Sequence, residues 1–195
     1  RRQREDVDAA HAQAAAPRTV SADLSQLRAQ RFITPAEKPT MMTESFRRVK
    51  RHIVANLGNP AATPRANLVM ITSSMPGEGK TFCAVNLAIS LAMEVDRTVT
   101  LVDADVGNPC VPAALGIREP MPRGFIDLIA DPSLDLADVL YETNLGKLTL
   151  LPAGGRHAHT TELLAGAACA DLLRRMSARY EDRIIIFDSA PLLVA

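Results

Sequence analysis

The stretch SSMPGEGKT, residues 73–81, decides how the chain folds. It ends in Gly79, Lys80 and Thr81, as the phosphate-binding pattern G-x-x-x-x-G-K-[ST] does, and Ser74 stands where that pattern opens with glycine. A strand-like run precedes the stretch and a helical one follows it, the order that such a loop needs. A Gly-containing turn between a strand and a helix is the alternative interpretation. The sequence predicts a site for a nucleoside triphosphate.

Each part of this loop has an expected task. Gly77 and Gly79 let the backbone curl so that its N–H groups face a phosphate, and the dipole of the following helix adds to them. Lys80 is expected to reach the β- and γ-phosphates, and the Thr81 hydroxyl to bind Mg²⁺. Ser74 is small enough for the opening position. The residues predicted to bind the nucleotide are Ser74, Pro76, Gly77, Glu78, Gly79, Lys80, Thr81 and Phe82.

The rest of the chain alternates between strand-like and helical segments. Short apolar runs occupy residues 67–73, 98–104, 147–153 and 183–189. Helical stretches separate them, most clearly at residues 81–95 and 161–180. Near-continuous apolar strands that alternate with helices indicate a parallel sheet covered on both faces. We therefore predict an α/β fold with a doubly wound, mostly parallel sheet of the P-loop NTPase type.

Three carboxylates follow apolar runs. Asp103 and Asp105 end the run at 98–104 and lie two residues apart, hence on one side of an extended segment. Asp188 ends the last run, where a buried carboxylate needs a partner such as Mg²⁺ or the Thr81 hydroxyl. Acids at strand ends beside a phosphate loop can hold Mg²⁺ or accept a proton. A pair of acids in a solvated loop is the alternative for Asp103 and Asp105.

Composition limits the class of protein. The 195 residues are 47% hydrophobic and 23% charged, which is ordinary for a globular domain. A formal net charge of zero gives no overall attraction to nucleic acid or an anionic membrane, although the N-terminal quarter is basic and the remainder acidic. Three cysteines without C-x-x-C spacing indicate a reducing compartment rather than a disulfide or zinc framework. No apolar run is long enough to span a membrane.

The chain divides into three predicted segments. Residues 1–20 are expected to form a linker or a frayed helix, residues 21–65 an N-terminal helical segment, and residues 66–195 the P-loop domain. A helix over about 43–56 is expected within the second segment. Because the chain begins with Arg1 and ends soon after Asp188, we expect a piece of a longer protein with an incomplete C-terminal part of the domain.

Three motifs carry a family resemblance. SSMPGEGKT, LVDADVGNP and RIIIFDSAP resemble, in that order, the Walker A, A′ and B motifs of bacterial tyrosine kinases, the P-loop autokinases that control exopolysaccharide export. ITPAEKPTMMTESFRRVKRHI and ELLAG…RYEDRIIIFDSAPLL resemble more narrowly the exosortase-associated (PEP-CTERM) subgroup. The resemblance covers about residues 20–195. It implies a protein-tyrosine autokinase that uses ATP and Mg²⁺ and regulates exopolysaccharide polymerisation or export.

The resemblance also implies site residues and partners. Expected catalytic residues are Lys80, Asp103 and Asp105, and expected metal ligands are Thr81, Asp103, Asp105 and Asp188. An E-x-x-R-x-x-R-like motif implies a homo-oligomer through Glu44, Arg47 and Lys50, whereas spacing alone leaves a solvated charged face as the alternative. A membrane-embedded polysaccharide co-polymerase adaptor is the other implied partner, with a cytoplasmic location at the inner face of the plasma membrane. Nucleic acid is not expected.

Some positions differ from the family pattern. Partitioning and septum-site ATPases share the fold but carry a lysine where Met75 stands, which favours the kinase. Gly107 replaces a basic residue that usually follows the Walker A′ aspartates. A partitioning-type ATPase and a catalytically inactive, nucleotide-gated partner of an export complex stay open as alternatives. His157 and His159 lie in a polar loop that either approaches the substrate or is plain surface.

Overall fold

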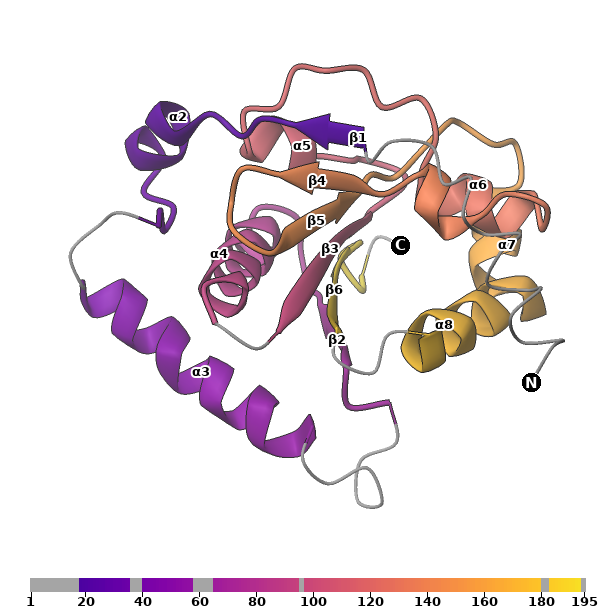
Figure 1. Cartoon of the computed structure of the whole chain (residues 1–195). Helices are drawn as coiled ribbons and strands as arrows, with labels where there is room; N and C mark the ends of the chain where they lie inside the picture. Colours follow the sequence, from indigo (N-terminus) through magenta and orange to yellow (C-terminus); the bar gives the residue numbers. More distant parts are fainter. Residues whose placement is uncertain (1–17, 36–39, 58–64, 95–96, 180–182, 194–195) are drawn as a thin grey trace, which may run out of the picture.

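The computed structural model describes residues 18–35, 40–57, 65–94, 97–179 and 183–193. In these ranges the chain forms a six-stranded sheet with helices on both faces (Figure 1). The strand order is β1-β4-β5-β3-β6-β2, and only the β4–β5 pair is antiparallel. The predicted α/β fold with a mostly parallel sheet is confirmed.

The sheet contains two strands that the sequence did not indicate. The six strands are β1 (Arg18–Val20), β2 (Leu68–Ile71), β3 (Thr98–Ala104), β4 (Tyr141–Thr143), β5 (Leu148–Leu151) and β6 (Arg183–Ser189). The four predicted runs correspond to β2, β3, β5 and β6. The expectation of a linker or helix over 1–20 is wrong at its end, because β1 pairs with β4 and buries Val20. Residues 1–17 lie outside the described residues.

Helices connect most of the strands. They are α2 (Leu24–Ala29), α3 (Met41–Leu57), α4 (Lys80–Ala92), α5 (Val111–Ala114), α6 (Phe125–Ala130), α7 (Thr160–Ala165) and α8 (Ala167–Arg179), with a 3₁₀ turn η1 (Leu136–Asp138). The helical stretch predicted over 161–180 is two helices, because Gly166 takes an extended conformation with ψ 165° and ends α7. Position 180 lies outside the described residues.

The sheet has a hydrophobic core on each face. Successive residues of a strand point to opposite faces, so Ile184 and Ile186 of β6 pack in one core while Ile185 and Phe187 pack in the other. The first core includes residues of α2 and α4, and the second includes residues of α6 and α8. Figure 1 shows these helices on opposite sides of the sheet. Both faces of the sheet are therefore covered, as near-continuous apolar strands require.

The carboxyl ends of β2, β3 and β6 place the candidate site. These three strands are parallel, with β6 between β2 and β3, so their ends meet at one edge of the sheet. In the register of β3 and β6, Asp103 lies opposite Asp188. Beyond β6 the chain returns to the loop after β2, where Leu192 N–H donates to the Ser73 carbonyl at 2.9 Å. Among the described helices, none is long and apolar enough to cross a membrane.

Candidate nucleotide site

The loop between β2 and α4 has the predicted curled shape. Gly77 and Gly79 have φ values of 82° and 94°, in the left-handed region that favours glycine. Gly79 is also the N-cap of α4, so the unpaired N–H groups of the first helical turn face the space above the loop. A helix terminus with these free donors and a positive dipole end is suited to bind an anion.

Glu78 shapes the loop. Its carboxylate accepts hydrogen bonds from the N–H groups of Ser74 and Met75 at 2.8 and 3.0 Å. This carboxylate therefore joins the start of the loop to its far end. We predicted Glu78 as a nucleotide-binding residue, and the contacts that its side chain makes are with the loop itself.

Phe82 contributes through its position in the helix. Its ring packs against Phe32, with ring centroids 5.0 Å apart. The side chain is thus part of the packing between α4 and the N-terminal segment. A contribution of Phe82 to phosphate binding would come from its backbone N–H in the first turn of α4.

Lys80 pairs with one of the predicted acids. Its Nζ lies 3.0 Å from Asp105 Oδ2, and both side chains are largely buried. Burial opposes the charged form of Lys80, but the hydrogen bond and the charge of Asp105 outweigh it and raise the pKa of the lysine. Lys80 is therefore held as a cation at the end of the loop, where α4 begins.

Thr81 connects the loop to the end of β6. Its hydroxyl donates to Asp188 Oδ2 at 2.6 Å, and its Oγ1 also lies 3.3 Å from Cys110 Sγ. Burial raises the pKa of Asp188, and the hydrogen bond from Thr81 and the charge of Lys80 oppose this rise. Cys110 was not predicted at the site, because nothing in its local sequence indicates the contact.

Asp103 is a buried carboxylate with an unusual pKa. It is fully buried, and its Oδ2 accepts the Val111 N–H at 3.0 Å. Burial raises its pKa to about 7 although this hydrogen bond lowers it, and the neighbouring charge of Asp188 raises it further. Such a carboxylate gains a favourable partner when a cation binds beside it.

Two buried oxygens fit a magnesium site. Asp103 Oδ1 and Asp188 Oδ1 have no hydrogen-bond partner among the described residues. A buried oxygen without a partner is costly, and the water shell of a bound cation would satisfy it. No group of three or more His, Cys, Asp or Glu side chains in the described ranges forms a complete metal cage. Mg²⁺ does not need such a cage, because proteins usually hold it through one or two carboxylates together with substrate phosphates.

A cavity of about 840 Å³ opens beside Lys80. Residues from the phosphate loop, the end of β3, the segment before α7 and the segment after β6 line it, among them Pro76, Lys80, Asp105, Gly107, Asn108, Arg156, His157, Thr160 and Pro191. Its size suits a ligand larger than a phosphate group. The polar loop with His157, for which sequence left two interpretations, forms part of its wall, whereas His159 is exposed at the start of α7.

Asp127 anchors this loop. Its Oδ1 lies 3.0 Å from His157 Nε2, and its Oδ2 accepts the N–H groups of Gly155 and Gly124 at 3.0 and 2.7 Å. Burial alone would raise the pKa of Asp127, but these hydrogen bonds outweigh it and hold the pKa below its ordinary value of 3.8. The sequence did not indicate Asp127, because two of these three partners, Gly155 and His157, lie about thirty positions further along the chain.

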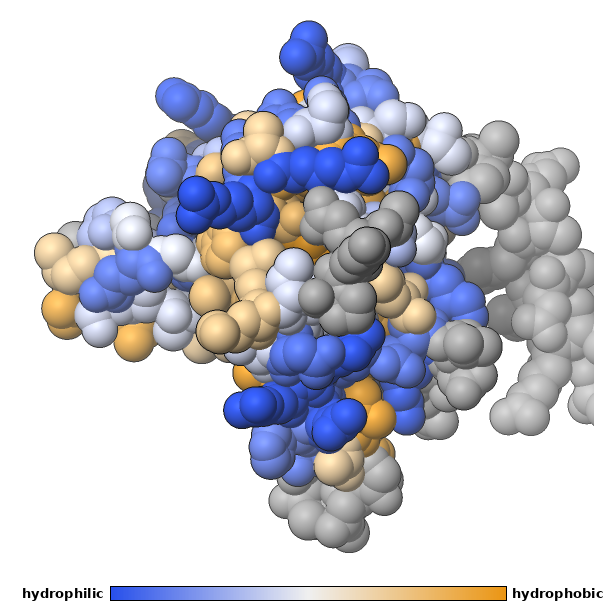
Figure 2. Space-filling view, turned by 90° about the vertical axis from the view of Figure 1, so that its left-hand side faces the viewer, coloured by the Kyte–Doolittle hydropathy of each residue, from blue (hydrophilic) through white to orange (hydrophobic). Residues whose placement is uncertain are grey.

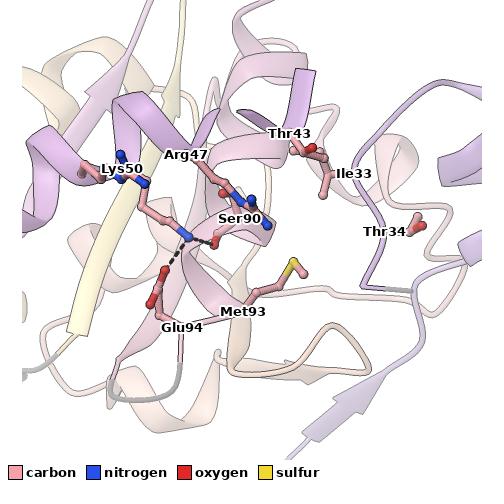
Figure 3. A pocket seen from close by; sticks show the side chains of 9 residues that line it. Ile33, Thr34, Thr43, Arg47, Lys50, Ser90, Met93 and Glu94 are labelled. Carbon is pink, nitrogen blue, oxygen red and sulfur yellow. Dashed lines mark hydrogen bonds and ion pairs between the residues drawn. The ribbon is translucent and has the colours of Figure 1, made fainter. Parts of the chain in front are cut away.

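The predicted oligomerisation residues make contacts within the chain. Lys50 Nζ lies 2.5 Å from Glu94 Oε1 and donates to the Ser90 carbonyl at 3.2 Å, as Figure 3 shows. Its side chain is 13% exposed. Glu44 and Arg47 pair with each other at 2.7 Å and are about half exposed. Lys50 therefore ties α3 to the end of α4, while Glu44 and Arg47 lie on the surface.

Hydrophilic residues gather on part of the surface around α3, where Met41 and Val49 are also exposed. Figure 2 faces the side of the molecule with α2 and α3, and hydrophilic residues gather over its lower part, where α3 lies. The helix carries Arg47, Arg48, Lys50 and Arg51 within one short stretch. A cavity of about 420 Å³ lies between this stretch and the end of α4 (Figure 3). This surface contributes to the basic character of the N-terminal quarter.

Comparisons with known proteins also indicate a P-loop NTPase. A family model described as ParA, NUBPL iron-transfer P-loop NTPase, matches residues 65–132. The tyrosine-protein kinase YwqD of Bacillus subtilis is 28% identical over 161 residues, which are 83% of this chain and 64% of YwqD. The succinoglycan biosynthesis transport protein ExoP of Rhizobium meliloti is 32% identical over 85% of this chain and 20% of ExoP. The chain thus spans less than two thirds of these relatives.

A solved structure shows the same arrangement over nearly the whole chain. The BceF tyrosine kinase domain superposes with a TM-score of 0.68 and 28% identity, covering 96% of this chain and 76% of that domain. The sheet order, the curled loop after β2 and the carboxylates that converge on it define a P-loop NTPase domain. Several relatives and structural neighbours of this chain, YwqD and BceF among them, are named as tyrosine kinases. Assignment to the PEP-CTERM subgroup stays a prediction.

Proposed function

We propose that the protein is an ATP-dependent protein-tyrosine autokinase. One observation carries this proposal: Lys80, Thr81 and three carboxylates from the ends of two strands, β3 and β6, converge on one phosphate loop. Phosphoryl transfer needs positioned cations and a metal more than it needs covalent chemistry from the protein. Lys80 would hold the transferred phosphate, Thr81 and Asp188 would hold Mg²⁺, and Asp103 and Asp105 would complete the metal shell or accept the tyrosine proton. The similarity to tyrosine kinases supports tyrosine as the acceptor.

The test is phosphotyrosine on the full-length protein after incubation with ATP and Mg²⁺. We expect wild-type protein to label itself on tyrosine and Lys80→Met to lose at least about a hundredfold in rate, because it removes the main cation of the site. Labelling of Lys80→Met at the wild-type rate would contradict the proposal. The matched control is Lys147→Met, which changes an exposed lysine beside β5.

A partitioning-type ATPase is the second candidate, since the matching family model is of the ParA type. The two candidates differ in where the γ-phosphate goes. An ATPase releases it as free phosphate, whereas a kinase leaves it on protein. Labelled phosphate found only in solution, with no phosphotyrosine on the full-length chain, would favour the ATPase.

We also propose a role in exopolysaccharide synthesis or export. ExoP is named as a biosynthesis transport protein for succinoglycan, and this chain is 32% identical to part of it. The proposed partner is a membrane-embedded polysaccharide co-polymerase adaptor, which would keep the kinase at the cytoplasmic face of the plasma membrane. Such a partner activates the kinase only through a higher affinity for its competent state. Faster autophosphorylation with the adaptor's cytosolic tail would support this role, and equal rates would oppose it.

We also propose that the protein forms a homo-oligomer whose subunits meet through α3. Glu44 and Arg47 are exposed and pair only weakly in isolation. A closed ring would repeat such contacts at every interface, which makes a weak contact effective. Lys50 is already occupied by Glu94 and Ser90 within the chain, so we assign the intersubunit contact to Glu44 and Arg47.

A further inference from the structure

The cavity beside Lys80 contains a second strong cation. Arg156 lines the same cavity as Lys80, Asp105 and Gly107, although it comes from the segment before α7 and not from the phosphate loop. No sequence motif marks this arginine. It is exposed at the cavity wall, whereas the carboxylates Asp103 and Asp188 are buried.

The backbone around Arg156 is held in place on both sides. Gly155 N–H donates to Asp127 Oδ2 at 3.0 Å, and His157 Nε2 lies 3.0 Å from Asp127 Oδ1. Thr160 then donates to the His157 carbonyl at 2.8 Å, which joins the segment to the start of α7. Because Asp127 holds the residues on both sides of Arg156, the side chain of Arg156 starts from a fixed position of the backbone. A fixed backbone reduces the conformational entropy that is lost when the guanidinium binds a ligand.

The guanidinium of Arg156 is not occupied by the protein. Within the part of the chain that the structure describes, it makes no hydrogen bond and no ion pair, whereas the neighbouring His157 is paired with Asp127. Lys80 is in the opposite situation, because Asp105 lies 3.0 Å from it. Of these two cations in the cavity, Arg156 is therefore the one with all its donors available.

The negative charge of the expected nucleotide requires more positive charge than Lys80 alone supplies. A nucleoside triphosphate carries about four negative charges, and much of the charge of Lys80 is balanced by Asp105. Gly107 adds no side chain on its side of the cavity, and a Cβ built there meets nothing within 4 Å. The space next to Gly107 is thus open to a side chain from another element. An arginine is suited to it, because its planar fork can bind two phosphate oxygens at once.

We propose that Arg156 binds the γ-phosphoryl group of the nucleotide, as a second cation beside Lys80. This inference rests on the proposed nucleotide-dependent function. The guanidinium binds the terminal phosphate and the charge that develops on it during transfer, while Lys80 spans the β- and γ-phosphates. Asp127 acts as a positioning residue, because it holds the segment that carries Arg156 without facing the phosphate itself.

The test compares full-length wild-type protein with Arg156→Gln and Arg156→Lys. We expect Arg156→Gln to bind ADP within about twofold of wild type, but to bind ATP more weakly and to transfer phosphate at least about tenfold more slowly. Arg156→Lys should recover part of the loss. Arg175→Gln, which changes an exposed arginine on α8 in a different cavity, should behave as wild type. Equal melting temperatures would show that the variants are folded.

A second measurement uses chemical rescue. Added guanidinium should restore part of the phosphoryl transfer in Arg156→Ala and none in Lys80→Met. If Arg156→Gln binds ATP and transfers phosphate as wild type does, or loses ADP and ATP affinity equally, then Arg156 does not bind the γ-phosphate. Lys80→Met separates the two proposals: an inactive Lys80→Met beside a fully active Arg156→Gln overturns only the assignment of Arg156, whereas an active Lys80→Met overturns the proposed function itself.

Discussion

The Thr81 hydroxyl donates a 2.6 Å hydrogen bond to Asp188, and this bond joins the first turn of α4 to the end of β6. The two residues lie 107 positions apart in the chain. The bond holds the proposed metal ligands together before any nucleotide binds. It also gives a buried carboxylate the partner that its position in β6 requires.

Removal of this donor should affect stability and magnesium use together. We expect Thr81→Ala to lower the free energy of unfolding of the nucleotide-free protein by about 1–2 kcal/mol, because Asp188 loses a partner in a buried site. Its Mg²⁺ requirement in phosphoryl transfer should rise at least tenfold, by about 1.4 kcal/mol of binding. Thr81→Ser keeps the hydroxyl and is the matched control. Chemical denaturation and a magnesium titration check both parts, and a normal Mg²⁺ requirement in Thr81→Ala would exclude Thr81 as a ligand.

Asp103 should make stability depend on pH. Its pKa rises from 3.8 to about 7 in the folded chain, so the folded state binds this proton more tightly than the unfolded state. The free energy of unfolding should therefore fall as the pH rises from about 4 through about 7. Asp103→Asn removes the ionisation, and we expect it to raise the melting temperature at about pH 8 by at least about 2–4 °C, equivalent to 1 kcal/mol for a chain of this size.

The same variant should lose activity. Asp103→Asn and Asp105→Asn are both expected to impair Mg²⁺-dependent turnover more than they impair folding. A variant that is more stable than wild type yet inactive would identify Asp103 as a residue kept for function. If Asp103→Asn instead melts earlier than wild type at every pH, then the carboxylate has a structural role. Melting curves of the metal-free protein across the pH range decide between these outcomes.

Asp127 should show the opposite pH dependence. Its folded-state pKa is lowered from 3.8, so the stability that it contributes is present above about pH 4 and is lost as the pH falls through the folded pKa. We expect Asp127→Asn to cost about 2 kcal/mol at neutral pH, since the ionised carboxylate accepts hydrogen bonds from several groups. The difference between variant and wild type should shrink below about pH 4. A difference that stays constant with pH would mean that shape, not charge, holds the segment. Asp138→Asn, which changes an exposed aspartate of η1, is the control.

Variants in α3 should distinguish residues that join subunits from residues that pack within one chain. Lys50→Ala should lower the free energy of unfolding by about 1 kcal/mol, because the largely buried Lys50 side chain loses its ion pair with the half-exposed Glu94 and its hydrogen bond to the Ser90 carbonyl. The double variant Glu44→Ala, Arg47→Ala should leave this free energy within about 0.5 kcal/mol of wild type and shift the oligomer toward monomer. Light scattering at several concentrations measures the mass. An unchanged mass in the double variant would show that the pair is only a solvated surface.

Local pattern was sufficient to predict where the curled loop and the three carboxylates lie in the fold. Each of them is marked by a short motif next to a strongly apolar strand, as the run that ends in Asp188 shows. The strands β1 and β4 were missed because three residues are too few to show a period. The pairing of Lys50 with Glu94, and of His157 with Asp127, joins distant parts of the chain, and no property of either segment alone indicates it.

The return of the chain after β6 has a consequence for the order of folding. Leu192 and Leu193 donate their N–H groups to the carbonyls of Ser73 and Ser74. The first residues of the phosphate loop are therefore held by residues almost 120 positions further along the chain. A contact of such long range forms late, because the intervening chain must first be brought together. The loop can curl locally much earlier, around Gly77 and Gly79. We therefore expect competence to bind nucleotide to appear after most of the secondary structure, as one of the last steps of refolding.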